Sequence, residues 1–201
     1  MEALKDLLLG LGGMVVLALF IGLPASKAAL GGGVTTVPEA GTQAGPAQDP
    51  VCKVLFSAFD KTLITPNHSY VSETVSAKDR PKNNEQILAG GIRYIQVNGK
   101  WRKSPVTTQQ LQEQDRENRQ NAKEYACRYV REEPVQGESA AVYNAHSKTE
   151  DFTSDAQVWV SKSRGLILRE EEVMDMGDAG GKFHISIRYE YGNVQAPAVS
   201  Q

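Results

Sequence analysis

Apolar and polar residues alternate strictly near the C-terminus, and this alternation predicts strands. In residues 184–191 every second side chain is apolar, which is typical of an antiparallel strand with one buried and one solvated face. The apolar positions are Ile185, Ile187, Tyr189 and Tyr191. Two strand-like segments precede this one, at residues 157–161 and 166–173. We therefore expect a sheet that carries a continuous apolar face.

A helical spacing of apolar residues predicts an amphipathic helix at residues 49–63. Asp49 supplies a capping carboxylate, and Pro50 occupies the first helical position, where proline is favoured. The apolar stripe consists of Val51, Val54, Leu55, Ala58, Phe59 and Leu63. Such a stripe must be buried, and the predicted sheet is the largest apolar surface that the chain offers for its burial.

Further strands are predicted between this helix and the C-terminal sheet. The dipeptide Asn98-Gly99 is typical of a type I′ turn and predicts a hairpin. The predicted strands are residues 69–77, 85–89, 92–97, 100–104, 125–130 and 138–145. With a second helix between the fourth and fifth of them, this segregated order is typical of an α+β fold with an antiparallel sheet and not of alternating βαβ units.

The second predicted helix, residues 107–123, is polar on all sides. Thr107 and Gln110 form a capping box, and Asp115 and Arg119 are spaced as a helical ion pair. Its apolar residues are Leu111 and Ala122. A helix this polar is solvated or marginally stable. It serves either as an exposed connector at the rim or as a mobile lid over a site, and the sequence leaves both open.

The N-terminal part of the chain is expected to lie outside the folded domain. Residues 7–23 are uncharged and mostly apolar, with small residues shortly after them, which predicts a secretory signal peptide over residues 1–28. The run is shorter than the roughly 20 residues that span a bilayer, but an uncleaved membrane anchor stays open as the alternative. We expect a flexible linker at residues 29–48, the folded domain at 49–197 and a tail at 198–201.

Export makes the two cysteines informative. Cys52 and Cys127 are the only cysteines in the chain, and an oxidising compartment such as the periplasm favours their pairing. A bridge between them would close a loop of about 75 residues and stabilise the fold by roughly 4 kcal/mol in the chain-entropy model. Two separate buried thiols are the alternative.

Composition and motifs point away from several classes of function. The net charge of −2 and the lack of a basic cluster argue against nucleic-acid binding. The histidines have no zinc-ligand spacing, and the acidic run at residues 170–172 matches no calcium loop, so we interpret this run as a solvated hairpin edge. No Gly-x-Ser-x-Gly elbow is present. The sequence thus predicts no catalytic residue, no cofactor and no metal.

Four features follow one another in a characteristic order along residues 49–197. They are the amphipathic helix, the hairpin from Gly90-Gly91-Ile92-Arg93-Tyr94 through Asn98-Gly99 to Trp101, the strand Val158-Trp159-Val160 before Gly165-Leu166, and the closing run Tyr189-Glu190-Tyr191-Gly192-Asn193-Val194 before Pro197. In this order the domain resembles the LolA-like superfamily of periplasmic lipoprotein carriers. The cysteine pair is not a general feature of that superfamily, which indicates a separate branch.

The resemblance implies a strongly curved antiparallel half-barrel, with both helices on its concave side and an apolar cavity between the layers. It implies a non-enzymatic periplasmic protein, which we expect to be a monomer, that binds a lipid, a lipoprotein acyl chain or another apolar ligand. The candidate ligand-binding residues are Ile92, Tyr94, Trp101, Trp159, Ile185, Ile187 and Tyr189. The alternative is a sensor or scaffold domain, tethered to the inner membrane, that binds an envelope protein partner. A filled core would use the same residue types as an open cavity, so the sequence leaves that choice open.

Overall fold

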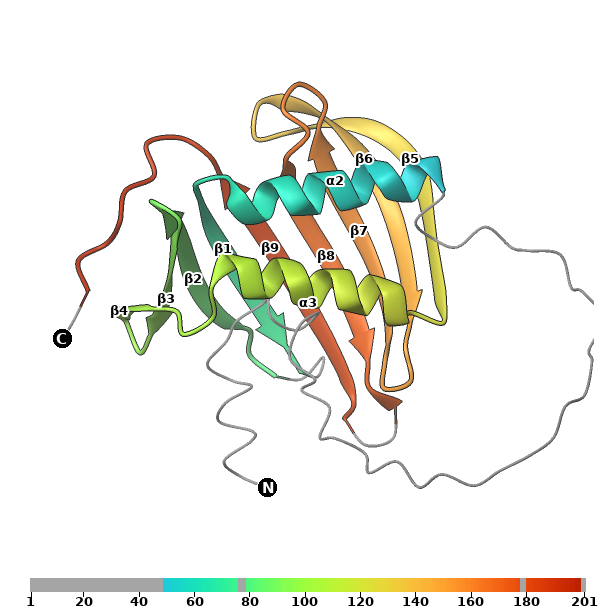
Figure 1. The fold of residues 1–201 in the computed structure, drawn as a ribbon, viewed down its shortest axis with the longest axis horizontal. Helices are drawn as coiled ribbons and strands as arrows, with labels where there is room; N and C mark the ends of the chain where they lie inside the picture. Colours follow the sequence, from blue (N-terminus) through green and yellow to red (C-terminus); the bar gives the residue numbers. More distant parts are fainter. Residues whose placement is uncertain (1–48, 76–78, 178–179, 200–201) are drawn as a thin grey trace, which may run out of the picture.

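The computed structural model describes residues 49–75, 79–177 and 180–199. They contain the helices α2 (Pro50–Ile64) and α3 (Thr108–Asn121) and an antiparallel sheet (Figure 1). The strands are β1 (Asn67–Thr74), β2 (Lys82–Ala89), β3 (Ile92–Val97), β4 (Lys100–Lys103), β5 (Glu124–Val135), β6 (Glu138–Lys148), β7 (Thr153–Ser161), β8 (Ile167–Asp175) and β9 (Lys182–Glu190). The predicted signal peptide and linker, residues 1–28 and 29–48, lie outside the described residues.

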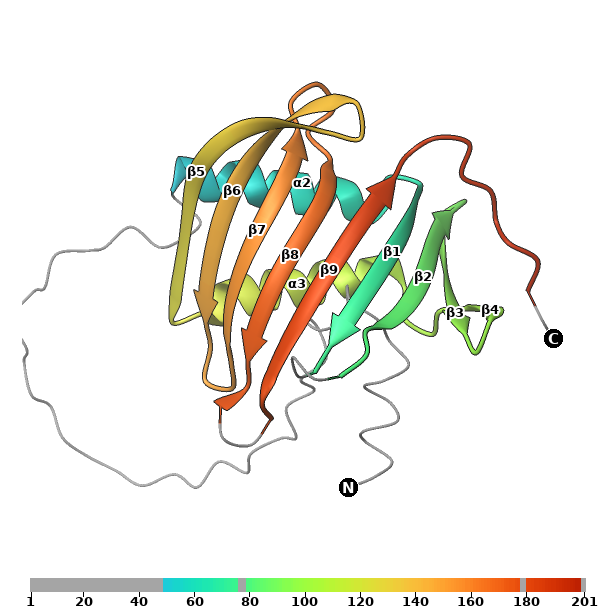
Figure 2. The same cartoon turned by 180° about the vertical axis from the view of Figure 1, so that it is seen from behind.

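The nine strands form one sheet in the order β4-β3-β2-β1-β9-β8-β7-β6-β5. The C-terminal strand β9 therefore joins two meanders, because it pairs with β1 on one side and β8 on the other. The sheet is curved and not closed, and both helices cover the same face of it (Figures 1 and 2). This confirms the predicted α+β class. No helix among the described residues is long and apolar enough to cross a membrane.

Helix α2 begins as its sequence predicts. The carboxylate of Asp49 accepts hydrogen bonds from the backbone N–H groups of Val51 at 2.7 Å and Cys52 at 3.3 Å. The buried stripe is rotated from the predicted one: Cys52 and Thr62 lie inside, and Val54 is exposed. Two bonds from α2 to distant parts of the chain explain the rotation. Cys52 forms the predicted disulfide with Cys127 on β5, and the Thr62 hydroxyl accepts a hydrogen bond from the N–H of Ile167 at 3.0 Å.

Helix α3 connects the two edge strands of the sheet, β4 and β5, and for this reason it crosses the sheet beside α2 (Figure 1). The predicted capping box between Thr107 and Gln110 is present. Arg119 forms the predicted ion pair with Asp115 and a second one, of 2.6 Å, with Asp60 of α2. Leu111 is the one residue of α3 that is fully buried.

The main core lies between α2 and the centre of the sheet. From the sheet, alternate residues of β7 and β9 contribute Val158, Val160, Ile185, Ile187 and Tyr189, and from the helix Leu55 and Ala58 pack against them. The alternating apolar residues predicted for β9 therefore form the sheet side of this core.

The β3–β4 hairpin turns through Asn98 and Gly99, whose φ values of 51° and 73° agree with the predicted type I′ turn.

Candidate functional site

The two faces of the sheet are distinguished by strand register, because directly paired residues of antiparallel strands share a face. Tyr189, Ile187 and Ile185 alternate along β9 with residues that point the other way, and they face the helices. Tyr94 of β3 pairs with Ile87 of β2, and Ile87 pairs with His68 of β1. His68 in turn pairs with Glu190 of β9, so all four residues share a face. Glu190 lies next to Tyr189 in sequence, so Tyr94 lies on the face without helices, here called the open face.

The seven predicted ligand-binding residues are divided between these faces. Ile185, Ile187 and Tyr189 lie together under the helices. Tyr94 packs with Ile87, Ala89, Trp101 and Val194 on the open face. Ile92 is exposed two positions before Tyr94, and Trp159 belongs to a separate cluster with Val142 and Leu168, in which the Arg169 guanidinium stacks on its ring. The structure therefore does not gather the seven into one cavity.

The helix-covered face is packed where α2 crosses it. The side chain of Tyr189 has no exposed surface, and Ile185 and Ile187 are almost as fully covered. The Tyr189 hydroxyl is buried without a hydrogen-bond partner among the described residues, and its ring stacks on that of Tyr191. This part of the interface between the layers is a filled core.

The same face becomes acidic where α3 crosses it. Glu170 and Glu172 of β8 pair with Ile187 and Ile185, so they point toward the helices and are 7% and 5% exposed. Our interpretation of residues 170–172 as a solvated edge is therefore wrong for two of the three. Only Glu171 points to the open face, where it accepts hydrogen bonds from Arg169 and Ser186. Because side chains alternate between the two faces of a strand, the carboxyl group of Glu171 points away from those of its two neighbours.

Glu170 and Glu172 line a small cavity enclosed by α2, α3 and the sheet. Its volume is about 30 Å³. The lining residues are Phe56, Phe59, Asp115, Tyr125, Ala145, Ser147, Ser154, Ala156, Glu170 and Glu172. The carboxylate of Glu172 accepts a hydrogen bond of 2.5 Å from the Ser154 hydroxyl. Glu170 has neither a hydrogen bond nor an ion pair within the described part of the chain.

Burial changes the protonation of these acids. It raises the pKa of Glu170 to about 8, assisted by the negative charges of Glu172 and Asp115. Burial likewise raises the pKa of Glu172, against the effect of its hydrogen bond from Ser154. The pKa of Asp115 is raised to about 6, again by burial, although the Arg119 guanidinium opposes the rise. The cavity therefore holds protonatable groups that change charge near neutral pH.

Arg119 is the cation nearest to this cluster, and it is already engaged. It pairs with Asp115 and Asp60, and its guanidinium lies 4.7 Å from the centre of the Phe56 ring. Phe56 in turn contacts Tyr125 edge-on, with ring centres 5.1 Å apart. The lining of the cavity is thus partly aromatic and partly acidic, and Arg119 contacts residues of both kinds.

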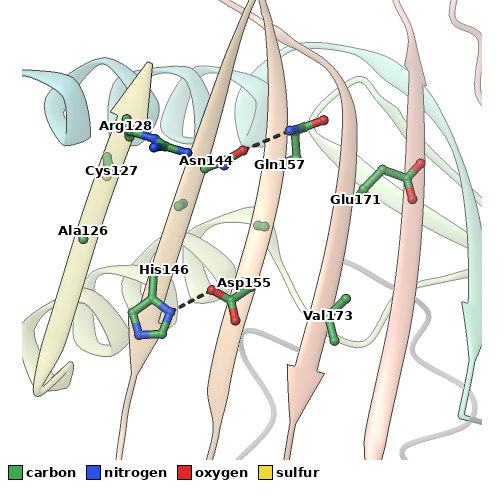
Figure 3. Close-up of a pocket in the computed structure, with 11 residues that line it drawn as sticks. Ala126, Cys127, Arg128, Asn144, His146, Asp155, Gln157, Glu171 and Val173 are labelled. Carbon is green, nitrogen blue, oxygen red and sulfur yellow. Dashed lines mark hydrogen bonds and ion pairs between the residues drawn. The ribbon is translucent and has the colours of Figure 1, made fainter. Parts of the chain in front are cut away.

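The open face carries a shallow groove of a different kind (Figure 3). Its volume is about 480 Å³, and its lining residues come from β5 to β8. Polar side chains cross it in two rows: His146 hydrogen-bonds Asp155 at 2.8 Å, and Gln157 donates to Asn144 at 2.9 Å. The groove is open to solvent, and alanine and valine side chains form much of its surface between these polar rows. Among the described residues, no group of three His, Cys, Asp or Glu side chains is arranged to hold a metal.

No protein-family model and no curated protein matches the chain. Among solved structures, the lipoprotein LppX of Mycobacterium tuberculosis is similar with a TM-score of 0.41 and 12% identity, over 74% of this chain and 100% of that one. MucB, solved in complex with MucA(peri), gives 0.37 and 15%, over 75% and 62%. A putative outer-membrane lipoprotein-sorting domain from Vibrio parahaemolyticus gives 0.22 and 7%, over 69% and 92%.

At such identities and TM-scores the likeness carries no argument about function. The function has to be inferred from the chain's own residues, and the feature that singles itself out is the acidic cavity under α3. Sequence reasoning missed it. The one available signal was that Glu170 and Glu172 alternate with Met174 along a strand-like run, which places all three on the same face.

Proposed function

We propose that this chain is a non-enzymatic periplasmic binding protein that holds a lipid-like ligand between the sheet and the helix layer, with α3 as a movable cover. One observation carries the proposal. Helix α3 lies on the same face of the sheet as the apolar core, beside α2, yet it buries a single leucine, Leu111, against the rest of the fold. The disulfide of Cys52 and Cys127, which is typical of exported proteins, supports the location.

The two helices differ in the free energy that is needed to separate them from the sheet. Burial of Leu111 is worth roughly 1.5 to 3 kcal/mol, and an exposed ion pair such as Arg119 to Asp60 adds about 1 kcal/mol or less. Helix α2 buries several apolar residues and is bonded covalently to β5. A chain of ten methylene groups gains about 8 kcal/mol on leaving water. This gain exceeds the cost of moving α3, so α3 is the helix that yields.

The floor of the proposed site is the part of β9 that faces the helices. Of the seven candidate residues, Ile185 and Ile187 would contact the ligand's apolar chain, because they pair with Glu172 and Glu170 of the cavity lining. Tyr189 would stay packed under α2. Ile92, Tyr94, Trp101 and Trp159 point away from the helices and would not reach the same ligand.

Ligand binding under α3 is tested by filling the space there. We would express the full chain by export, so that its disulfide forms, and titrate an environment-sensitive apolar dye in competition with decanol. Ala156→Leu enlarges a residue that lines the cavity and should weaken binding at least tenfold. Ala126→Leu makes the same change at an exposed position of the open face and should leave binding unchanged. Circular dichroism confirms that both variants fold.

Two results would contradict the proposal. One is equal dye binding by the Ala156 and Ala126 variants, which would place the dye elsewhere, for example on the apolar N-terminal run. The other is native mass spectrometry of protein from its own host that finds no lipid bound, together with no dye binding by the wild-type chain.

A protein partner on the open face is the second candidate function. The groove of about 480 Å³ in Figure 3 favours it, because it combines apolar surface with hydrogen-bonded polar side chains and is open to solvent. A tethered sensor would keep its N-terminal run, whereas a free carrier would be cleaved near Ala28. N-terminal sequencing of the mature protein distinguishes the two.

A further inference from the structure

We propose that the cavity under α3 is a binding site for a primary ammonium group, so that the ligand is an amphiphile with a cationic amine at the end of an apolar chain. This inference rests on the proposed function and deepens it, since it assigns the polar end of the ligand. The geometry points to an ammonium group for three reasons, which are the unpartnered carboxyl group of Glu170, the balance of charge around it, and the size and walls of the cavity.

The first reason is the state of Glu170. Only 7% of the surface of Glu170 is exposed, and its side chain lines the cavity. It has no hydrogen-bond or ion-pair partner within the described residues, whereas Glu172 beside it is bonded to Ser154. Buried carboxyl groups are nearly always paired, and leaving one unpaired costs several kcal/mol. A group that donates hydrogen bonds to Glu170 would remove this cost.

The second reason is that acids outnumber bases around the cavity. Three carboxyl groups line it, those of Asp115, Glu170 and Glu172. The nearby cation, Arg119, is shared between Asp115 and Asp60. A carboxylate or phosphate head would be an anion in a poorly solvated space whose lining includes no basic side chain, which is strongly unfavourable. A positive head can instead pair with a carboxyl group that gives up its proton.

The third reason is the size and character of the walls. A volume of about 30 Å³ admits one ammonium group or about two water molecules, and it is too small for a trimethylated amine. Phe56, Phe59 and Tyr125 form the remaining wall. Aromatic rings attract cations over their faces, and Arg119 already sits over the ring of Phe56. The alkyl chain would continue from this aromatic wall toward Ile185 and Ile187 of β9 once α3 moves.

Binding of an amine is coupled to loss of a proton. At neutral pH burial keeps Glu170 largely protonated, since its pKa is about 8. When R–NH₃⁺ enters, the carboxyl group becomes a carboxylate paired with the ammonium, and one H⁺ leaves to solvent. The groups that interact electrostatically with Glu170 are Glu171 and Glu172 on β8, Asp115 on α3, Tyr125 on β5 and Tyr189 on β9, and Arg119 on α3 is paired with Asp115. Affinity should therefore rise with pH up to about 8 while the amine remains charged.

The test compares three ten-carbon probes by isothermal titration calorimetry on the full disulfide-bonded chain: decylamine, decanol and decanoate. At pH 8 we expect decylamine to bind at least tenfold more tightly than decanol, and decanoate to bind more weakly than both. Between pH 6.5 and pH 8 the affinity for decylamine should rise roughly tenfold and that for decanol should not change. Titration in two buffers of different ionisation enthalpy should show release of up to one proton per amine bound.

Two variants assign the effect to Glu170. Glu170→Gln keeps the shape of the side chain and should reduce decylamine binding to the level of decanol, with no proton release. Glu171→Gln changes the adjacent residue, which faces the open side, and should bind all three probes like the wild type. Unchanged decanol binding by Glu170→Gln shows that this variant folds.

The outcomes separate this inference from the proposed function. If decanol binds but decylamine binds no more tightly at either pH, the ammonium site is wrong and a binding protein for uncharged apolar ligands remains. If decanoate binds more tightly than decylamine, the ammonium site is likewise overturned. If none of the three probes binds the wild-type chain, the proposed function fails as well.

Discussion

At the scale of single residues, burial is unfavourable for the polar groups of Glu170 and Tyr189. Glu170 has a carboxyl group with no partner, and Tyr189 has a hydroxyl with no partner, both within the described residues of the helix-covered face. Each therefore lowers the stability of the fold in the absence of a ligand. Such residues are informative because replacing them should stabilise the protein, in contrast to most core substitutions.

Glu170 makes stability depend on pH in an unusual direction. Its pKa is about 8 in the folded chain against an ordinary value of 4.5, so the folded state binds more protons than the unfolded state between these values. Stability contributed by its protonated form is complete at low pH and is lost as pH rises through about 8. The raised pKa values of Glu172 and Asp115 act in the same direction.

We therefore predict that Glu170→Gln is more stable than the wild type at pH 9, by roughly 1 to 3 kcal/mol, and close to it at pH 5. Urea unfolding at the two pH values measures the difference. Glu171→Gln on the opposite face serves as the control, and its difference in stability from the wild type should be the same at both pH values. A Glu170→Gln variant that is less stable than the wild type at pH 9 would mean that the ionised carboxyl group has an unrecognised partner.

Tyr189→Phe removes the unpartnered hydroxyl and keeps the ring that packs against the core. We expect the free energy of unfolding to rise by about 1 kcal/mol or to stay unchanged, because burial of an unsatisfied hydroxyl costs about 1 to 3 kcal/mol. Tyr191→Phe is the matched control: the Tyr191 hydroxyl donates to the carbonyl of Ile167, so its loss should destabilise the protein. Similar destabilisation by both substitutions would contradict the assignment.

Residue-level prediction from the sequence succeeded where local spacing decides the outcome and failed where burial decides it. The alternation of Ile185, Ile187 and Tyr189 was read correctly, since period two is a property of the strand itself. The burial of Glu170 depends on a helix that crosses above it from a distant part of the chain. Charged residues are rarely buried, so a run of three glutamates was interpreted as solvated.

At the scale of elements, α2 and α3 are placed side by side but are held by different forces. The caps of both were predictable, because Asp49 and the Thr107–Gln110 pair act within four residues of the chain. The position of α3 was not predictable from its own polarity. It lies on the sheet because the chain must travel from β4 at one edge to β5 at the other.

We predict that α3 opens more easily than α2. In hydrogen–deuterium exchange, the amides of α3 should exchange at least tenfold faster than those of α2, since opening of α3 exposes a single buried leucine. Leu111→Ala should accelerate exchange in α3 further and leave β9 unchanged. Glu117→Ala at an exposed position of the same helix is the control. Equal protection of the two helices would contradict a movable cover.

At the scale of the whole molecule, the fold is closed by contacts between distant parts of the chain. Strand β9 completes the sheet between β1 and β8, and the disulfide links α2, near the start of the described residues, to β5 at the far edge. The fold class followed from the segregated order of elements, but the order of strands did not. Nothing in the alternation of β9 specifies its neighbours, because many registers bury an apolar face equally well.

The disulfide therefore provides the last test, of how firmly the helix layer is fixed. Cys52 and Cys127 are separated by 75 residues, and breaking the bridge returns loop-closure entropy to the unfolded chain, worth roughly 4 kcal/mol. We predict a loss of about 3 to 4 kcal/mol in the free energy of unfolding for the double variant Cys52→Ala and Cys127→Ala, measured by urea titration. The reduced wild-type chain should lose a similar amount, which separates the bridge from the change of side chain. In both, amide exchange in α2 should become faster but remain slower than in α3, because Leu55 and Ala58 still pack α2 against the sheet. A loss below about 1 kcal/mol would show that packing of Leu55 and Ala58 alone fixes α2 to the sheet.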